Sequence, residues 1–381
     1  MKDNNADKRN KKDRKKRSLF GRIVVALLSL LALLGLVAMT LSVLSSYINP
    51  SRFVWVSFFG LTFWGILLFN LVVLMLLLLM WSRKAWIAVI AMLIALPGIY
   101  KSFSTGKSHN GGELRVMAYN ILKFHDQFDK NKSNEAVALD MVKMVKEYDP
   151  DVLCMQEFAI CFPNTSRKEC INQLGEMMGM PYNYYHNKAN FRGNVIFSRY
   201  PLSALEEGTS FAKEKEYGAV AQVDAGQYGV FYVLCCHLTS FLLTPQELTV
   251  FSESGNSKEQ VEEYSKSIIS KMKKAYERRS KEVEEMLADI PNDGRPIILC
   301  GDFNDTPLSY TYHQIRSAGF VDGFVKTGRG IGHTYAGRLP LLRIDYIWAN
   351  EQIQPMSFKR IKYKGSDHYP VILDFNVKHG L

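Results

Sequence analysis

Charged side chains are almost absent from residues 23–100, where only Arg52, Arg83 and Lys84 carry a charge. The region consists of three uncharged stretches, Ile23–Ser51 and Phe53–Trp81 with 29 residues each and Ala85–Tyr100 with 16. About 20 apolar residues cross a bilayer as an α-helix. We therefore predict a three-helix transmembrane region in residues 23–100.

Two other interpretations of these stretches compete with three spans. A cleaved signal peptide has a shorter apolar part and a small-residue cleavage site, neither of which Ile23–Ser51 shows. The third stretch, with Pro97 near its end, is short enough to be a re-entrant or interfacial helix. Three spans would place the C-terminal part of the chain outside the membrane, and two would leave it in the cytoplasm.

The basic residues near the N-terminus set the expected orientation. Residues 1–17 hold nine Lys or Arg, and such residues favour the cytoplasmic side of a membrane. We expect residues 1–22 to form a basic cytoplasmic tail, and a linker at 101–112 to lead to an extracytoplasmic domain at 113–381. The three-span anchor and the lack of a eukaryotic sorting signal indicate the inner (cytoplasmic) membrane of a bacterium.

An excess of positive charge is missing from residues 101–381. They hold 34 basic and 34 acidic residues, so the net charge of +10 belongs to the first hundred residues. A domain that grips nucleic acid is expected to present a basic surface. The equal numbers of basic and acidic residues therefore argue against DNA or RNA as the substrate, without excluding a local basic patch.

Several signatures of ester, nucleotide and metal chemistry are also missing. The chain has no P-loop and no Ser-based nucleophile elbow. No close Cys or His pair accompanies Cys161 and Cys170, which argues against a thiolate metal site. These two cysteines flank a polar loop and can close a small disulfide in an exported domain, whereas the other four are expected to be buried thiols.

Strands and helices alternate after residue 112. Short apolar runs predict strands, and apolar residues at helical spacing predict helices. The predicted strands are 113–120, 151–156, 195–198, 218–223, 230–236, 296–300, 344–348 and 370–375, and the predicted helices are 135–148, 171–178 and 259–290. The pattern indicates a layered α/β fold with a mostly antiparallel sheet core.

Polar side chains stand where many of these strands end. Asp302 and Asn304 follow an apolar run two residues apart, which places them on one face of an extended chain, although such pairs also occur in turns. Other strand ends carry Asn120, Glu157, His237, Asp345, Asp367 and His368. Each alone is usually a solvated loop residue, but together on one rim of a sheet they would form a polar site.

Seven segments that contain these residues share the order of motifs in one family. They are 116–120, 151–157, 196–202, 237–238, 301–304, 343–347 and 366–368. In this they resemble the endonuclease/exonuclease/phosphatase superfamily, with its deoxyribonuclease I-like fold, over roughly residues 113–376. The resemblance implies an α/β fold, namely a four-layered α/β sandwich with two packed mixed β-sheets, and hydrolysis of phosphoesters that depends on Mg²⁺ or Mn²⁺.

The resemblance also implies a metal site and a base. Glu157, Asn120 and Asp367 correspond to the metal site, where Mg²⁺ takes carboxylate oxygens, waters and substrate oxygens. His368, paired with Asp345, corresponds to the base that activates water, which suits an imidazole at neutral pH.

The remaining matched residues are implied to handle the phosphoryl group. Asp302 and Asn304 would orient the water and bond the phosphoryl oxygens, and His237 would donate to the phosphoryl group or the leaving oxygen. Either Asp302 or His368 can take the proton from water. Asp305 is expected to be structural.

We predict a membrane-anchored, metal-dependent phosphoesterase that cleaves a phosphodiester or phosphomonoester, in a lipid head group or small phosphoester, by in-line attack of water. The alternatives are a membrane-tethered nuclease that acts on extracytoplasmic DNA or RNA, and an inactive binding domain. The inactive binding domain is disfavoured because every motif position holds a residue that is competent for catalysis. The segment Ser240–Ser252 is apolar for a loop, and either meets the membrane, covers the site or packs against helix 259–290.

Overall fold

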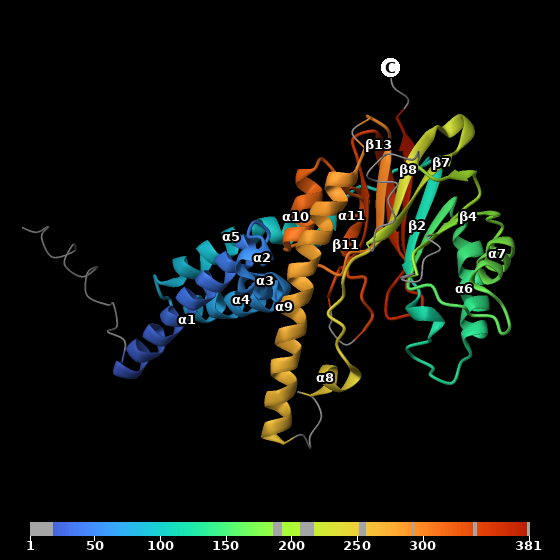
Figure 1. Ribbon diagram of the computed structural model, residues 1–381. Coiled ribbons are helices and arrows are strands. Elements are labelled where there is room, and N and C mark those ends of the chain that lie inside the picture. The colour runs from blue at the N-terminus through green and yellow to red at the C-terminus, as the bar shows by residue number, and fades with distance from the viewer. Residues whose placement is uncertain are drawn as a thin grey trace, which may run out of the picture.

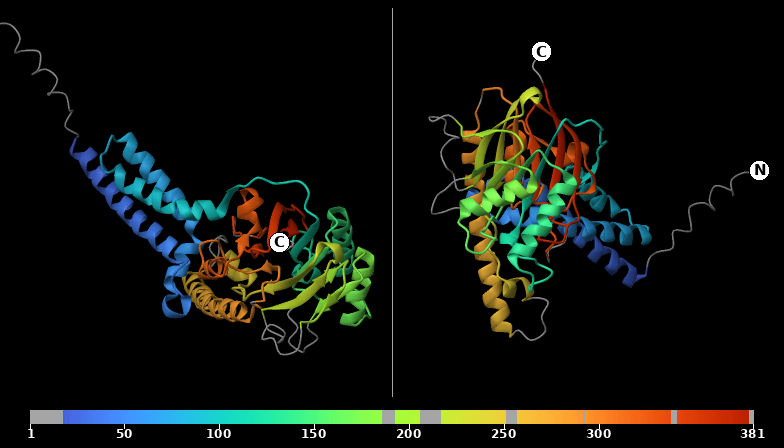
Figure 2. Two further views of the ribbon diagram at one scale, coloured as in Figure 1. Left: turned by 90° about the horizontal axis from the view of Figure 1, so that it is seen from above. Right: turned by 90° about the vertical axis from the view of Figure 1, so that its right-hand side faces the viewer.

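The computed structural model describes residues 18–185, 193–205, 217–250, 257–291, 293–337 and 341–378. A bundle of N-terminal helices projects from one side of a layered α/β domain (Figures 1 and 2). Residues 1–17 of the predicted basic tail lie outside the described residues.

The apolar region folds into five helices. They are α1 (Leu19–Leu44), α2 (Pro50–Phe53), α3 (Trp55–Leu61), α4 (Phe63–Leu79) and α5 (Ala85–Ser102). In the described part of the chain, α1 and α5 are each long and apolar enough to cross a membrane. The pair α3 and α4 is bent by 69° and adds a third span only if the two count as one. The predicted apolar segments are therefore helical, and among the described residues two or three helical units have the length and composition to cross a membrane.

A buried amide and small residues hold this bundle together. Asn70 of α4 is fully buried and donates through Nδ2 to the carbonyl of Gly35 on α1, at 3.0 Å. A Cβ on Gly35 would lie 2.5 Å from the Asn70 amide oxygen, so only glycine permits this approach. Such close contacts and interhelical hydrogen bonds are what associate helices in an apolar solvent.

Two six-stranded sheets pack face to face in the α/β domain. The first has the order β13 (Ile353–Arg360), β14 (Val371–Val377), β2 (Leu114–Asn120), β3 (Val152–Gln156), β5 (Val195–Ser198) and β4 (Tyr182–Tyr185). The second has the order β10 (Val321–Asp322), β12 (Asp345–Ala349), β9 (Ile297–Asp302), β8 (Val230–His237), β7 (Gly218–Asp224) and β6 (Leu202–Ser203). Both sheets are mixed, since β2 runs parallel to β3 and β8 parallel to β9 while their other neighbours are antiparallel.

Helices cover the outer face of each sheet. Figure 1 shows α6 (Asn134–Tyr148) and α7 (Arg167–Met178) on one side, and α9 (Lys258–Asp289) and α10 (Tyr310–Ser317) on the other. The alternation along β2 explains the layering, because Val116 and Ala118 pack between the sheets while Met117 packs under α6 and α7. The predicted four-layered α/β sandwich is confirmed.

Most predicted elements are present with ends shifted by a few residues. Several short elements were missed: β4, β6, β10, α8 (Pro245–Thr249), α11 (Gly323–Thr327), β1 (Phe103–Thr105) and β11 (Arg329–Ile331). The eight-residue elements β13 and α10 were missed as well. The predicted linker 101–112 is too long, since residues 101 and 102 end α5 and β1 pairs with β11. A three-residue strand is stabilised by its partner rather than by a pattern of its own, so the sequence did not mark it.

All six cysteines are buried thiols in this structure. Cys154, Cys235 and Cys300 lie between the sheets and Cys236 lies under α9, as predicted for the apolar runs. The Sγ atoms of Cys161 and Cys170 are neighbours at 3.3 Å in the layer beneath α7.

Candidate active site

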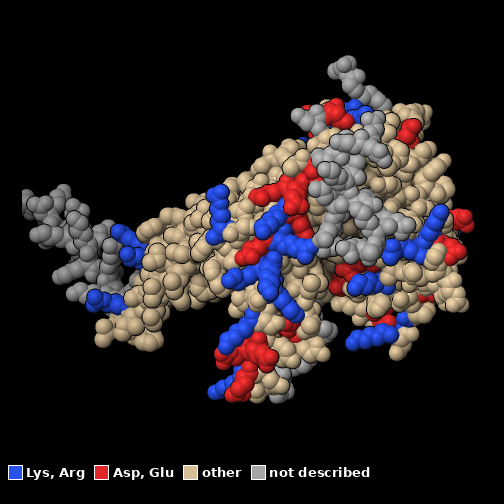
Figure 3. Space-filling model, viewed as in Figure 1, with Lys and Arg blue, Asp and Glu red and all other residues tan. Residues whose placement is uncertain are grey.

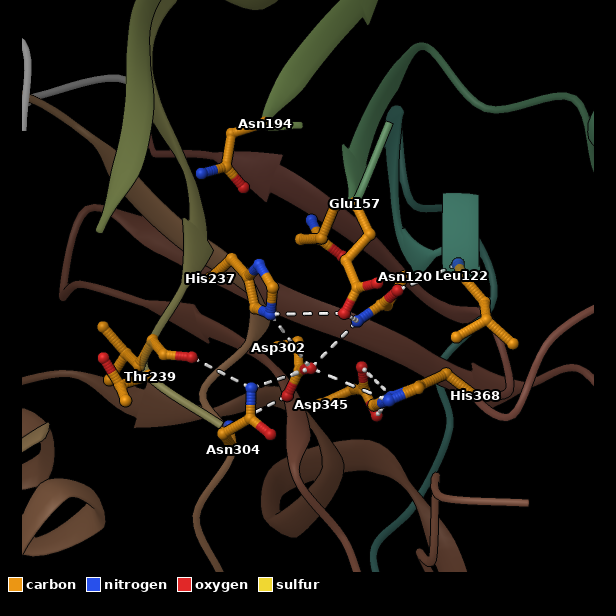
Figure 4. Close-up of polar contacts among 12 residues, drawn as sticks. Asn120, Leu122, Glu157, Asn194, His237, Thr239, Asp302, Asn304, Asp345 and His368 are labelled. Atoms are coloured by element: carbon orange, nitrogen blue, oxygen red, sulfur yellow. Dashed lines mark hydrogen bonds and ion pairs between the residues drawn. The ribbon is translucent and has the colours of Figure 1, made fainter. Parts of the chain in front are cut away.

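Strand register places three polar side chains side by side at the edge of the second sheet. His237 ends β8, Asp302 ends β9 and Asp345 begins β12; the pairing aligns His237 with Asp302, and Asp302 with Asp345. In the first sheet, Asn120 ends β2 beside the end of β3, and Glu157 follows β3 directly. The two sheets present these groups at one rim of the sandwich (Figure 4).

Asn120 links the two sheets across this rim. Its Nδ2 donates to Asp302 Oδ2 at 3.1 Å and to Glu157 Oε1 at 3.3 Å, while its Oδ1 accepts from the backbone of Leu122 at 3.1 Å. Asn120 therefore orients both carboxylates through its amide nitrogen. Its predicted role as a metal ligand stays a prediction.

His237 faces the same two carboxylates without a direct hydrogen bond to either. Its Nε2 lies 3.7 Å from Glu157 Oε1 and 3.8 Å from Asp302 Oδ2. Both ring nitrogens are buried and have no hydrogen-bond partner among the described residues. A buried imidazole in this state is costly unless a ligand meets it, so His237 is placed to receive a group in the site.

His368 and Asp345 form a buried pair. His368 Nδ1 lies 2.9 Å and 3.0 Å from the two carboxylate oxygens of Asp345, and its Nε2 lies 3.7 Å from Asp302 Oδ2 and 3.9 Å from Asp367 Oδ1. Burial opposes protonation of this imidazole, but the charges of Asp345 and Asp302 outweigh it and raise the pKa of His368 well above its ordinary value. Asp345 thus holds one ring nitrogen and leaves Nε2 facing the site.

The turn after β9 fixes Asp302 and Asn304. Gly301 has φ +132° and a Cβ there would lie 2.1 Å from the carbonyl of Cys236, so the position requires glycine. Asn304 adopts a left-handed backbone, φ +52°, and donates through its backbone to Asp302 Oδ1 at 2.8 Å and through Nδ2 to Asp302 Oδ2 at 3.1 Å. The Asp-Asn pair is therefore both a turn and a part of the site.

Carboxylates crowd this rim. Burial raises the pKa of Asp302 to about 6, where His368 acts against the shift and Asp345 adds to it. Burial also raises the pKa of Asp367, with His368 acting against it and Glu157 adding to it. Four acidic groups face two imidazoles, so negative charge is left over that a cation would neutralise.

The donor set suits a divalent cation with oxygen ligands. Ligand atoms of Asp302, Asp345 and His368 lie within 4.8 Å of one another. Both oxygens of Asp345 face His368 Nδ1, which leaves Asp302, Glu157 and Asp367 as the carboxylates open to the cavity. Such oxygens are the ligands that Mg²⁺ and Mn²⁺ prefer.

The structure thus brings all eight predicted residues into one cluster: Asn120, Glu157, His237, Asp302, Asn304, Asp345, Asp367 and His368. Asp305, which was expected to be structural, lines the same cavity but makes none of these contacts. The Asp305 carboxylate accepts from Thr311 at 2.8 Å and lies 3.4 Å from the buried Arg279 guanidinium.

Sequence reasoning missed several residues that support the site. Thr334 Oγ1 accepts from the backbone of Asp345 at 3.0 Å, and the Tyr335 ring stands 5.4 Å from the His368 ring. Ser366 Oγ donates to the carbonyl of Asn120 at 2.8 Å. Ser366 stood beside Asp367 in a matched segment and could have been found, whereas Thr334 and Tyr335 lie in a loop with no strand pattern.

Two packed mixed sheets with this rim of carboxylates, amides and a His-Asp pair define the class of phosphoester hydrolases. Residues 117–368 match the model of the Endonuclease/Exonuclease/phosphatase family, and since this is more than half of the chain, the chain belongs to that family. It is a hydrolase acting on phosphoester bonds. A second model, for a domain of unknown function (DUF8431), matches residues 22–102.

Solved structures with this fold include an endonuclease/exonuclease/phosphatase from Beutenbergia cavernae, at 18% identity and TM-score 0.46, covering 70% of this chain and 72% of that chain. The human Nocturnin catalytic domain matches at 17% identity and TM-score 0.45, covering 70% and 93%. The 3' phosphatase NExo from Neisseria matches at 16% identity and TM-score 0.46, covering 69% and 99%. None of the curated proteins compared with the chain matches it.

Proposed function

We propose that this protein is a membrane-anchored, Mg²⁺-dependent phosphoesterase that hydrolyses a lipid or small phosphoester outside the cytoplasm. The observation that carries the proposal is the buried His368–Asp345 pair, whose free Nε2 faces Asp302 in a cavity lined also by Glu157 and Asp367. This arrangement combines a proton acceptor, a proton donor and oxygen ligands within one cavity.

The metal would be held by carboxylate oxygens of Glu157 and Asp367, with Asn120 orienting Glu157. When bound, Mg²⁺ would neutralise charge on the phosphoryl oxygens and so lower the barrier to attack of water on phosphorus. The crowded carboxylates supply the negative potential that such an ion needs.

The chain's own residues position the water and the phosphoryl group. Asp302 is held by the Asn304 and Asn120 amides and, with its raised pKa, is a stronger base than an ordinary carboxylate. We propose that the Asp302 carboxylate accepts the proton of the attacking water. His368 keeps its own proton because Asp345 raises its pKa, and it stabilises the developing charge together with His237.

The charge balance of the domain favours a lipid or small phosphoester over nucleic acid. Residues 101–381 have no excess of basic residues. Figure 3 shows positive side chains gathered along α9 beside an almost uncharged helical bundle, with acidic side chains among them. This is the distribution of a protein that meets a membrane surface rather than one that encloses a polyanion.

The anchor is proposed to lie in the inner membrane of a bacterium, with the hydrolase domain on its outer side. The basic residues 1–17 favour a cytoplasmic N-terminus, and α1, the α3–α4 pair and α5 would then cross in turn. The C-terminal ends of α1 and α5 lie nearest the α/β domain (Figure 1). The proposed orientation places these two ends outside the cytoplasm.

The test uses the full chain in detergent and bis-p-nitrophenyl phosphate. We expect hydrolysis with Mg²⁺ or Mn²⁺, none with EDTA, and none from Glu157→Ala or His368→Ala variants that keep the circular dichroism spectrum of the wild type. Activity that survives both substitutions would contradict the site. A panel of plasmid DNA, RNA, sphingomyelin and phosphoinositides then separates the lipid phosphoesterase from a nuclease, and a fully folded but inert protein would indicate a binding domain.

A further inference from the structure

The cavity at the site continues into an apolar groove. The cavity measures about 400 Å³, and the catalytic rim forms one of its walls. A second part of the lining is apolar, and we call it the apolar groove: Leu61, Phe241, Leu242, Leu243, Leu248 and Leu342. The polar residues Lys123, Ser240, Asp305, Thr306 and Tyr335 also line the cavity. A phosphoester bound at the rim would therefore have hydrocarbon walls beside it.

The groove is built partly from the membrane bundle. Leu61 is the last residue of α3, just before the bend into α4. It belongs to a cluster with Phe58 of α3, Phe241 and Tyr276 of α9, and the rings of Phe241 and Tyr276 stand 5.3 Å apart. The groove therefore runs from the catalytic rim to the outer end of the bundle.

The segment 240–248 serves two purposes. Phe241 packs against α9, which matches one of the interpretations offered for this apolar loop. Leu242, by contrast, is 75% exposed, and Leu243 and Leu248 are only half-buried. These leucines line a concave cavity beside polar groups, and ligand sites are typically apolar cavities that hold a few polar groups.

The groove's position matches the expected height of lipid head groups. Trp55 at the start of α3 is half-exposed, with Lys273 of α9 4.9 Å from the centre of its ring, and Tyr47 is exposed in the turn after α1. Aromatic rings and lysines collect where a membrane meets water. Figures 1 and 3 show α9, with its basic side chains, crossing this end of the bundle.

We propose that the apolar groove binds the hydrocarbon chain of a membrane lipid while the lipid's phosphoester reaches the rim of Asp302 and His368. This inference rests on the proposed function and specifies its substrate class. A sugar phosphate or a nucleotide would leave the leucines of the groove in water, whereas a lipid chain buries them. Because Leu61 belongs to the bundle, the chain can enter from the bilayer without crossing water.

The decisive comparison varies only the hydrocarbon chain. The substrates are ethyl and octyl p-nitrophenyl phosphate, both below the micelle concentration, with the full-length enzyme in phosphatidylcholine nanodiscs. Each buried methylene is worth roughly fourfold in binding. We expect kcat/KM to be at least about 50-fold higher for the octyl ester, from burial of about half of its six extra methylenes.

The groove is then tested with Leu242→Gln, which cannot unfold the protein because the side chain is exposed, and with Leu243→Gln as a second variant. Both should reduce the octyl-to-ethyl ratio at least about fivefold, since a polar side chain replaces an apolar contact. Leu139→Gln, on the exposed face of α6, is the matched control and should keep the wild-type ratio. Equal kcat/KM for the two esters, or a ratio unchanged in both groove variants, would overturn the inference.

A second arm tests whether the substrate comes from the membrane. Hexadecyl p-nitrophenyl phosphate is placed either in the liposomes that hold the enzyme or in separate ones. We expect at least about tenfold faster hydrolysis in the shared liposomes, and equal rates would overturn entry from the bilayer. If neither ester is hydrolysed with Mg²⁺, the proposed function fails instead, so the two failures are distinguishable.

Discussion

Ser45 at the end of α1 donates a 2.6 Å hydrogen bond to the carbonyl of Leu308, 263 positions further along the chain. The Leu308 side chain packs among Met39, Phe63 and Ala95 of the bundle. Leu308 lies six residues after Asp302, on the same loop as Asn304. The N-terminal helical bundle therefore holds the loop that follows Asp302 directly, and the candidate site has a set position relative to the bundle.

Gly60 makes this contact possible. A Cβ on Gly60 would lie 2.4 Å from the carbonyl oxygen of Leu308, so Gly60→Ala should push the loop away from the bundle. We expect lower kcat and faster cleavage of the Leu308 loop by protease. Gly65→Ala in α4 is the control, because nothing lies within 4 Å of its Cβ position. Equal behaviour of the two variants would show that the docking does not affect the site.

Asp345→Asn removes the charge that faces His368 Nδ1. The imidazole should lose its preferred orientation and much of the charge that keeps it protonated, so kcat should fall by about 10²–10⁴-fold. Bis-p-nitrophenyl phosphate hydrolysis measures this, with circular dichroism to check the fold. Asp374→Asn, which breaks an ion pair with Arg115 far from the rim, is the control and should keep most activity. Near wild-type turnover in Asp345→Asn would remove this pair from the mechanism.

Glu157→Gln keeps the shape of a proposed metal ligand and removes its charge. The Mg²⁺ concentration for half-maximal activity should rise by at least about tenfold. Titrations of activity against Mg²⁺ after EDTA treatment measure the change. Glu113→Gln, an exposed substitution at the edge of the domain, should leave the titration unaltered. An unchanged Mg²⁺ requirement in Glu157→Gln would assign the metal to other residues.

Glu247 connects the segment 240–248 to α9 through hydrogen bonds. Burial raises the pKa of its carboxyl, but hydrogen bonds from Lys271, Ser267 and Thr244 outweigh burial and lower the pKa to about 2. A lowered folded-state pKa stabilises the protein above the ordinary carboxyl value, and the stabilisation is lost as pH falls from about 4.5 to about 2.

Glu247→Gln should therefore lower the Tm at pH 7 by roughly 3–6 °C. The difference from the wild type should shrink as the pH approaches 3. Thermal unfolding in detergent, followed by tryptophan fluorescence, measures both. A Tm difference that does not depend on pH would show that the carboxylate charge is not what holds the loop.

The proposed number of spans decides on which side of the membrane the hydrolase domain is expected to lie. An alkaline phosphatase fused after Leu381 should be active in a bacterial host if α1, the α3–α4 pair and α5 all cross the membrane, because that enzyme requires the oxidising outer compartment. A fusion that is expressed but inactive would indicate two spans and a cytoplasmic domain.

Local patterns were sufficient for much of the architecture. Uncharged stretches must avoid water, so the helices of the bundle could be read from residues 23–100 alone. Asn120 and Glu157 could be recognised because each follows an apolar strand, and a strand's end is a local feature. The strands β1 and β11, three residues each, could not be recognised, because only their pairing with each other defines them.

The sequence by itself determined the helical bundle, the alternating elements and the chemical types of the eight site residues, because each depends on neighbours along the chain. Only the tertiary structure decided that His237, Asp302 and Asp345 share one row, since strand register depends on distant partners. Likewise, only packing placed Leu61 and Leu242 in one groove beside His368 and tied Leu308 to Ser45. Contacts between segments that are far apart in sequence depend on how whole surfaces fit together, which no local pattern records.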